Sequence, residues 1–175
     1  MAEKIVTIFG SGTAASGSKE YKIAEQLGKL LAKAGFTIIN GGYGGTMLAA
    51  AKGAVSQGGK TIGVTCRAFK GSAANEYVTK EVQTNTLLER LETLVDSAQA
   101  YIVLPGSTGT LLELAYVWEL KNKGFIRTGK PVILVGDFWN PLVKLITDYE
   151  ELTGIHLEKA KTAEHAIKVL KVKLR

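Results

Sequence analysis

Apolar residues follow two alternating patterns along the chain. Short, nearly continuous apolar runs, typical of buried strands, occupy residues 4–9, 36–39, 61–65, 100–104 and 131–135. Between these runs, apolar residues recur every three or four positions, which predicts helices over residues 21–34, 46–56, 86–97, 111–121 and 139–149. Residues 67–83 follow neither pattern and are expected to be irregular.

This alternation predicts βαβ units that build a parallel sheet covered by helices on both faces. Right-handed crossovers then favour a doubly wound, Rossmann-like α/β fold of three layers (α/β/α) with strand order 3-2-1-4-5. No linker or internal repeat interrupts the pattern, so residues 1–175 are interpreted as a single domain. In such a fold the loops after the first, second and fourth strands meet at one edge of the sheet.

Composition excludes several classes of protein. Apolar residues make up 46% of the chain and charged residues 22%, as in ordinary globular proteins. No apolar run is long enough to cross a membrane, and the first residues lack the layout of a signal peptide, so we expect a cytoplasmic protein without a membrane partner. The single cysteine, Cys66, excludes an internal disulfide and a cysteine-rich metal site, and His156 and His165 lack ligand spacing. Neither a metal nor a cofactor is predicted.

The net charge of +6 favours a phosphorylated ligand without identifying one. Much of this charge lies near the C-terminus, where lysines surround the apolar residues Ala163, Ile167 and Leu170. We interpret the segment as the solvated face of an amphipathic helix. The alternative, a tail that binds nucleic acid, is disfavoured because no aromatic residues are interleaved with the lysines.

Glycine-rich turns follow three of the predicted strands and lead into helices. Their residues are Gly10, Ser11 and Gly12; Gly41, Gly42, Gly44 and Gly45; and Gly106, Ser107, Thr108, Gly109 and Thr110. The first N–H groups of a helix lack internal partners and carry its positive dipole end, and glycine lets the backbone approach a ligand closely. We therefore predict that these turns bind a phosphate group. The alternative for residues 41–45 is a turn needed only for close helix–sheet packing.

The first turn also matches the dinucleotide pattern G-x-G-x-x-G/A over residues 10–15. That pattern requires an acidic residue about 20 positions later to bind a ribose hydroxyl. Asn40 ends the second predicted strand, so this acidic partner is missing. A mononucleotide fits the sequence better than a dinucleotide.

Glu113 and Arg90 are the candidate charged groups of the site. Thr110 and Glu113 have the T-x-x-E form of a capping box, so one interpretation is that this carboxylate closes the helix. The other is a carboxylate beside a phosphate site, able to bind ribose hydroxyls or orient a water. Arg90 lies at the border of the apolar stripe formed by Leu87, Leu91, Leu94 and Val95. It can present its guanidinium at a cleft, or form a surface ion pair.

The segment Pro105–Glu113 resembles the PGGxGTxxE motif of the lonely guy (LOG) family, which is also catalogued under the name lysine decarboxylase. Ser107 replaces the second glycine of the motif. Arg90 falls where the family has an arginine in an MHxRK-like stretch, but Leu87, Leu88 and Leu91 replace the flanking Met, His and Lys. The resemblance extends over most of the chain to about residue 145 and is most specific at residues 105–113.

The resemblance implies a phosphoribohydrolase, which cleaves the N-glycosidic bond of a nucleoside 5′-monophosphate such as AMP or a cytokinin ribotide. Arg90 and Glu113 would then be catalytic, and the glycine turns would bind the phosphate. It also implies a homodimer or larger homo-oligomer. The alternative is a non-catalytic nucleotide or molybdenum-cofactor carrier, because such carriers are similar in the same glycine motif. A lysine decarboxylase would need a pyridoxal phosphate site, which no residue set suggests.

Overall fold

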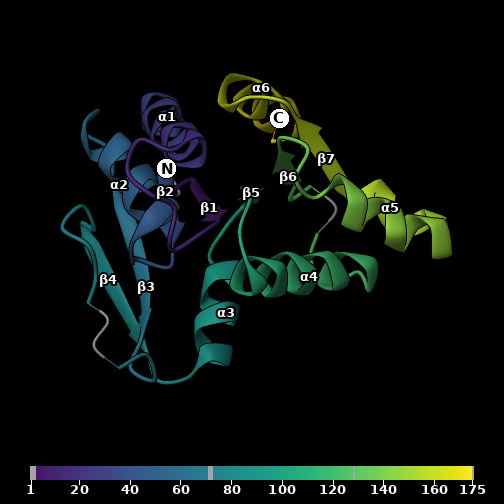
Figure 1. The fold of residues 1–175 in the computed structure, drawn as a ribbon, viewed down its shortest axis with the longest axis horizontal. Helices are drawn as coiled ribbons and strands as arrows, with labels where there is room; N and C mark the ends of the chain where they lie inside the picture. Colours follow the sequence, from purple (N-terminus) through teal and green to yellow (C-terminus); the bar gives the residue numbers. More distant parts are fainter. Residues whose placement is uncertain (1–2, 71–72, 128, 175) are drawn as a thin grey trace.

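The computed structural model describes residues 3–70, 73–127 and 129–174. Within these residues, seven strands form one all-parallel sheet in the order β4-β3-β2-β1-β5-β6-β7 (Figure 1). The strands are β1 (Ile5–Phe9), β2 (Thr37–Asn40), β3 (Thr61–Cys66), β4 (Lys80–Thr84), β5 (Ala100–Val103), β6 (Val132–Val135) and β7 (Leu157–Ala160). The predicted order of the five central strands, 3-2-1-4-5, is confirmed as β3-β2-β1-β5-β6.

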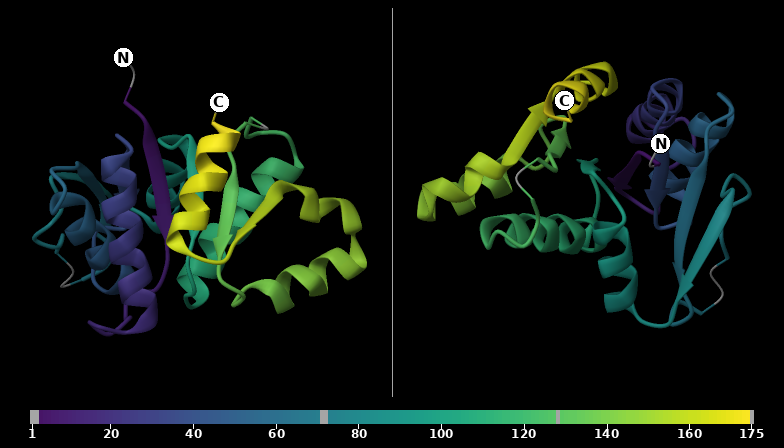
Figure 2. Two further views of the ribbon diagram at one scale, coloured as in Figure 1. Left: turned by 90° about the horizontal axis from the view of Figure 1, so that it is seen from above. Right: turned by 180° about the vertical axis from the view of Figure 1, so that it is seen from behind.

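Helices cover both faces of the sheet, as expected for a doubly wound α/β fold. They are α1 (Lys19–Lys33), α2 (Gly45–Val55), α3 (Leu87–Asp96), α4 (Thr108–Asn122), α5 (Asn140–Tyr149) and α6 (Ala163–Lys173), with a 3-10 helix, η1 (Glu151–His156). α1, α2 and α6 lie on one face of the sheet and α3, α4 and α5 on the other (Figure 2). Each face carries its own apolar core. The three predicted layers are therefore present.

The two edge strands were not predicted. β4 lies at the end of the segment that was expected to be irregular, and β7 precedes the C-terminal helix. Most residues of β4 are exposed, and its sequence is Lys-Glu-Val-Gln-Thr. A central parallel strand is buried on both faces and is apolar throughout, whereas an edge strand need not be, so these two strands lack the apolar signal.

The carboxyl ends of β1, β2 and β5 bring the three glycine-rich turns to one edge of the sheet. The first two turns are joined directly, because the backbone N–H and the hydroxyl of Thr46 both donate to the Ser11 carbonyl, at 2.8 and 3.0 Å. β1 pairs with both β2 and β5, which places its turn between the other two. This edge carries the candidate site.

Candidate functional site

A pocket of about 270 Å³ opens at this carboxyl edge. Its wall includes Arg90 and Glu113 together with residues of the first and third glycine turns, namely Gly10, Gly12, Ser107, Gly109 and Thr110. A neighbouring hollow of about 330 Å³ is lined by Ser11, Gly106 and Ser107. Thr108 begins α4 and is exposed, but it lines neither space. Ser107 lines both spaces.

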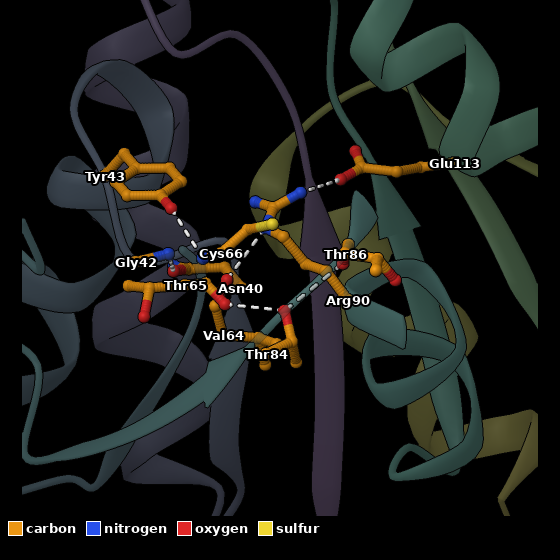
Figure 3. A network of polar contacts seen from close by, with 10 residues as sticks. All are labelled: Asn40, Gly42, Tyr43, Val64, Thr65, Cys66, Thr84, Thr86, Arg90 and Glu113. Atoms are coloured by element: carbon orange, nitrogen blue, oxygen red, sulfur yellow. Dashed lines mark hydrogen bonds and ion pairs between the residues drawn. The ribbon is translucent and has the colours of Figure 1, made fainter. Parts of the chain in front are cut away.

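Arg90 is buried, with 7% of its surface exposed. Its Nε donates to the Val64 carbonyl of β3 at 2.8 Å, and its guanidinium carbon lies 5.5 Å from the ring centroid of Tyr43 (Figure 3). The same carbon lies 5.8 Å from the ring centroid of Phe69. These distances fit cation–π contacts. The expected alternative of a surface ion pair is wrong in its location: Arg90 does pair with an acid, Glu113, but the loops that carry the two rings cover its end of α3 and bury it.

Glu113 faces Arg90 across the pocket, with 3.6 Å between its Oε1 and the arginine Nη1 (Figure 3). The two side chains are only 13% and 8% exposed. Burial raises the pKa of the Glu113 carboxyl from its ordinary value of 4.5 to about 7, although the charge of Arg90 acts in the opposite direction. A carboxyl with such a pKa exists in both protonation states near neutral pH.

The capping-box interpretation of Glu113 is wrong. α4 begins at Thr108, with Ser107 as its N-cap and no side-chain capping bond, so Thr110 already lies inside the first turn. Thr110 instead packs on Gly106, where an added Cβ would come within 2.2 Å of the threonine Oγ1. The Glu113 carboxylate therefore does not cap the helix and instead lines the pocket.

The turn between β2 and α2 forms the floor beneath Arg90. The Asn40 Oδ1 accepts the Gly42 N–H at 2.8 Å, which holds the start of the turn. Gly41 leaves room for the arginine, since an added Cβ would lie 1.7 Å from Nη2 of Arg90. Gly44 and Gly45 lie against the backbone of the first turn, where a Cβ on Gly45 would come within 2.2 Å of the Ser11 carbonyl oxygen. These glycines allow close packing against Arg90 and the first turn, and none of them lines the pocket.

Three comparisons place the chain among known proteins. A family model described as the SLOG cluster4 family matches residues 3–167. The chain belongs to this family. A protein from Mycobacterium tuberculosis named cytokinin riboside 5′-monophosphate phosphoribohydrolase is 34% identical over 121 residues, which is 67% of this chain and 63% of the mycobacterial protein. An uncharacterised protein from Archaeoglobus fulgidus is 33% identical over 75% of this chain and 85% of its own length.

A solved structure is also similar over its full length to this SLOG cluster4 member. It is the molybdenum cofactor binding protein of Rippkaea orientalis, at 27% identity and a TM-score of 0.82, with 100% of this chain and 99% of that chain covered. The resemblance to LOG proteins that the Pro105–Glu113 motif indicates is thus confirmed at the level of the family. The mycobacterial relative is named as a hydrolase and the Rippkaea protein as a cofactor-binding protein. The activity of this member is therefore argued below from its own residues.

Sequence reasoning missed several residues that line the pocket of this SLOG cluster4 protein. Tyr43, Met47, Phe69 and Leu112 contribute apolar surface to its wall. Leu87, expected in the buried stripe of α3, is 43% exposed and joins this wall. Tyr43 could have been noticed as a large residue inside a glycine run. Phe69 gave no signal because it lies in the segment without a pattern.

The pocket combines features that suit a phosphorylated, partly apolar ligand. The N-terminus of α4 offers N–H groups to an anion, Glu113 and Arg90 offer opposite charges, and the aromatic and leucine wall offers a surface for a planar group. No group of three or more His, Cys, Asp or Glu that could hold a metal ion occurs among residues 3–70, 73–127 and 129–174. A search of the same described residues finds no helix with the length and apolarity to span a bilayer.

Proposed function

We propose that the protein hydrolyses the N-glycosidic bond of a nucleoside 5′-monophosphate and releases the free base and ribose 5-phosphate. The observation that carries this proposal is the nearly buried pair of Arg90 and Glu113, 3.6 Å apart, in a pocket that also includes the N-terminal turn of α4. The name of the mycobacterial relative supports the same reaction. The substrate class follows from a phosphate site beside an apolar wall.

The phosphate is assigned to the turn that begins α4. This helix has 15 residues, so the positive end of its dipole and its first unpaired N–H groups point at the Gly106–Gly109 turn. The Ser107 hydroxyl is exposed beside these groups and adds a donor. Anchoring at this turn leaves the ribose near Glu113 and the base near Tyr43, Phe69 and Leu112.

Glu113 is assigned the reacting role. Cleavage of an N-glycosidic bond builds positive charge on the ribose, which an ionised carboxylate stabilises while it accepts a proton from the attacking water. The base leaves with the electron pair of the broken C–N bond and takes up one proton, so that the carboxylate is ionised again once its own proton is released to the base or to solvent. A pKa of about 7 suits this task, because the carboxylate is then basic enough to take a proton and still ionised in a large fraction of molecules. Arg90 remains positively charged and does not serve as a proton donor. It holds the carboxylate and offsets negative charge on the substrate.

The test is incubation with AMP and related nucleoside 5′-monophosphates, with chromatographic detection of base and ribose 5-phosphate. Glu113→Gln should lower the rate on the order of 10²-fold or more, because the amide cannot take a proton. Glu119→Gln is the matched control, since this glutamate lies on the same helix, 59% exposed, in a surface pair with Lys123. Unphosphorylated adenosine should react much more slowly than AMP. The absence of base from the wild type, or equal release by Glu113→Gln, contradicts the proposal.

A second candidate function is a carrier that binds a phosphorylated pterin or nucleotide without turnover. It is favoured by the match to the Rippkaea protein, which covers the whole chain, and by Leu87 and Leu91 in the wall, where the LOG family has Met and Lys beside the arginine. Calorimetric titration with molybdenum cofactor and with AMP distinguishes the two. Tight binding with no released base supports the carrier, and turnover of AMP excludes it as the sole function.

A further inference from the structure

The polar contacts of Arg90 fix only part of its guanidinium. The Nε–H group donates to the Val64 carbonyl at 2.8 Å, and Nη1 lies 3.6 Å from Oε1 of Glu113. A single hydrogen bond at Nε holds that atom but leaves the plane of the guanidinium free to turn about it. The distance between Nη1 and the carboxylate therefore depends on what packs against the face of the guanidinium.

Tyr43 is held at both ends. At its tip, the hydroxyl accepts the backbone N–H of Cys66 at 2.8 Å, which ties the ring to the end of β3 (Figure 3). At its base, the Asn75 Nδ2 donates to the carbonyls of Gly42 and Tyr43, at 3.0 and 2.8 Å, and the Asn75 N–H donates to the Gly42 carbonyl at 2.8 Å. These bonds fix the ring between the second glycine turn and the sheet.

The hydrogen bond between Tyr43 and Cys66 takes the place of a strand partner. β2 pairs with β3 only as far as Gly63, so the N–H of Cys66 lies past the end of β2. Cys66 is 3% exposed, and a buried N–H group without a partner costs free energy comparable to a lost hydrogen bond. The Tyr43 hydroxyl supplies the acceptor, so this bond stabilises the ring in its position.

Phe69 lies beside the same guanidinium but is held less firmly. Its ring centroid is 6.0 Å from that of Tyr43, and the two rings are tilted by 50°. Phe69 is 36% exposed, and its side chain has no polar group that could tie it to the sheet. Of the two rings, Tyr43 is therefore the one that can fix the guanidinium.

We propose that Tyr43 is a positioning residue, whose ring holds the Arg90 guanidinium where Nη1 faces the Glu113 carboxylate. The guanidinium carbon lies over this ring at 5.5 Å, within the range in which an aromatic face attracts a cation. The attraction is stronger for a desolvated cation, and Arg90 is buried. Tyr43 acts through Arg90 and exchanges no proton. Its role rests on the proposed function, because the pair that it positions is the one to which the hydrolysis is assigned.

Loss of this contact and a general loosening of the pocket would change Glu113 in opposite directions. Arg90, Glu113 and the Tyr43 hydroxyl are the titratable groups that line the pocket within the described part of the chain. Burial raises the pKa of the Glu113 carboxyl, and the charge and hydrogen bond of Arg90 lower it. A guanidinium that moves away therefore raises this pKa further, whereas a loosened wall admits water and lowers the pKa.

The experiment compares Tyr43→Leu, which removes the ring, with Tyr43→Phe, which keeps the ring and removes the hydroxyl. Carbon NMR of protein labelled on its glutamate carboxyl groups follows the titration of Glu113, and Glu113→Gln assigns the signal. The pKa of this carboxyl should rise above its wild-type value of about 7 in Tyr43→Leu and stay near it in Tyr43→Phe. At neutral pH, kcat/KM for AMP should fall on the order of 10-fold in Tyr43→Leu, mainly through kcat, and by less than about 3-fold in Tyr43→Phe.

Tyr149→Leu is the matched control. Tyr149 is 94% exposed on α5 and does not line the pocket, so the pKa and the rate should both stay at their wild-type values. Tyr43 is only half-buried, so its variants should fold, which the amide spectrum checks. A pKa of Glu113 that is unchanged or lower in Tyr43→Leu overturns the proposal. An equal rise in Tyr43→Phe also overturns it, because the ring is then not what holds Arg90.

The two measurements separate the role of Tyr43 from the proposed function. If the wild type releases no base, the hydrolysis is contradicted, and the NMR comparison still decides whether the ring of Tyr43 positions Arg90. If base is released and Tyr43→Leu keeps the wild-type kcat/KM, the hydrolysis stands and the positioning role of Tyr43 is overturned.

Discussion

Glu113 has the unusual property of a carboxyl that titrates near neutral pH, because burial raises its pKa to about 7. If the ionised form takes a proton from water, kcat/KM for AMP should rise about tenfold per pH unit below pH 7 and level off above it. The pH dependence of base release measures this directly. Glu119→Gln should keep the profile, since this exposed residue does not line the pocket. A rate that falls as the pH rises through 7 would instead assign the protonated carboxyl to the reaction.

Substitution of Gly41 tests whether activity depends on the exact position of the Arg90 guanidinium. A Cβ at this residue would lie 1.7 Å from Nη2 of Arg90 and 2.7 Å from Sδ of Met47, whereas its own backbone has a negative φ that alanine accepts. We expect Gly41→Ala to fold but to displace the guanidinium, and to lower base release on the order of 10-fold or more. Gly129→Ala is the control, because a Cβ there meets open space. Wild-type activity in Gly41→Ala would show that the arginine can move without loss.

The environment of Arg90 could not be predicted from its own helix. The periodicity of α3 places it correctly at the border of the apolar stripe, but it describes only neighbours on that helix. Its burial comes from Tyr43 and Phe69, on two loops that are distant in sequence, and from the Val64 carbonyl of β3. The glycine turns were easier to predict, because glycine followed by a helix gives a local signal wherever the chain folds.

At the scale of elements, α1 and α2 cross so closely that glycine is needed on each helix. A Cβ at Gly28 would lie 2.1 Å from the Ala50 carbonyl oxygen, and one at Gly53 would lie 2.0 Å from that of Glu25. Gly28→Ala should therefore destabilise the protein, because overpacking costs about 1–3 kcal/mol and the better helix propensity of alanine returns about 1 kcal/mol. Urea unfolding measures the difference against Gly129→Ala. Equal or greater stability of Gly28→Ala would contradict this reading of the crossing.

The more fully a strand is buried, the more clearly the sequence pattern predicts it. β1, β2, β5 and β6 are almost entirely buried and have mostly apolar sequences, so they and their order could be predicted. β4 and β7 are edge strands held mainly by the backbone of one neighbour, β3 and β6 respectively. Backbone hydrogen bonds do not require apolar side chains, so these two strands have no apolar run in the sequence. Their positions are known only from the structure.

At the scale of the whole molecule, α4 lies between the candidate pocket and an apolar groove that it forms with α5. Its first turns carry Thr110 and Glu113 in the pocket, and the same turns carry Leu111 in the groove beside α5. Neighbouring residues of one helix therefore line both spaces. The first glycine turn is positioned by the end of β1, whereas Thr110 and Glu113 are positioned by α4.

The stability of the whole chain should also depend on the charge of Glu113. In the unfolded chain this carboxyl titrates near its ordinary pKa of 4.5, and in the folded protein near 7. Between these values the folded state binds more protons than the unfolded state, so the contribution is complete below pH 4.5, declines as the pH rises and levels off above 7. The loss amounts to at most about 3 kcal/mol over that window.

Other carboxyls titrate in the opposite sense, so the measurement must be a difference. The pKa of Glu25 is lowered by its hydrogen bond to Lys29, and that contribution weakens as the pH falls. Glu113→Gln keeps Glu25 and removes only the buried acid. The free energy of unfolding of the wild type minus that of Glu113→Gln should therefore fall between about pH 4.5 and about pH 7 in urea titrations. A difference that stays constant or rises would mean that Arg90 holds the buried carboxyl ionised throughout, and the general-base role would then lose its near-neutral pKa.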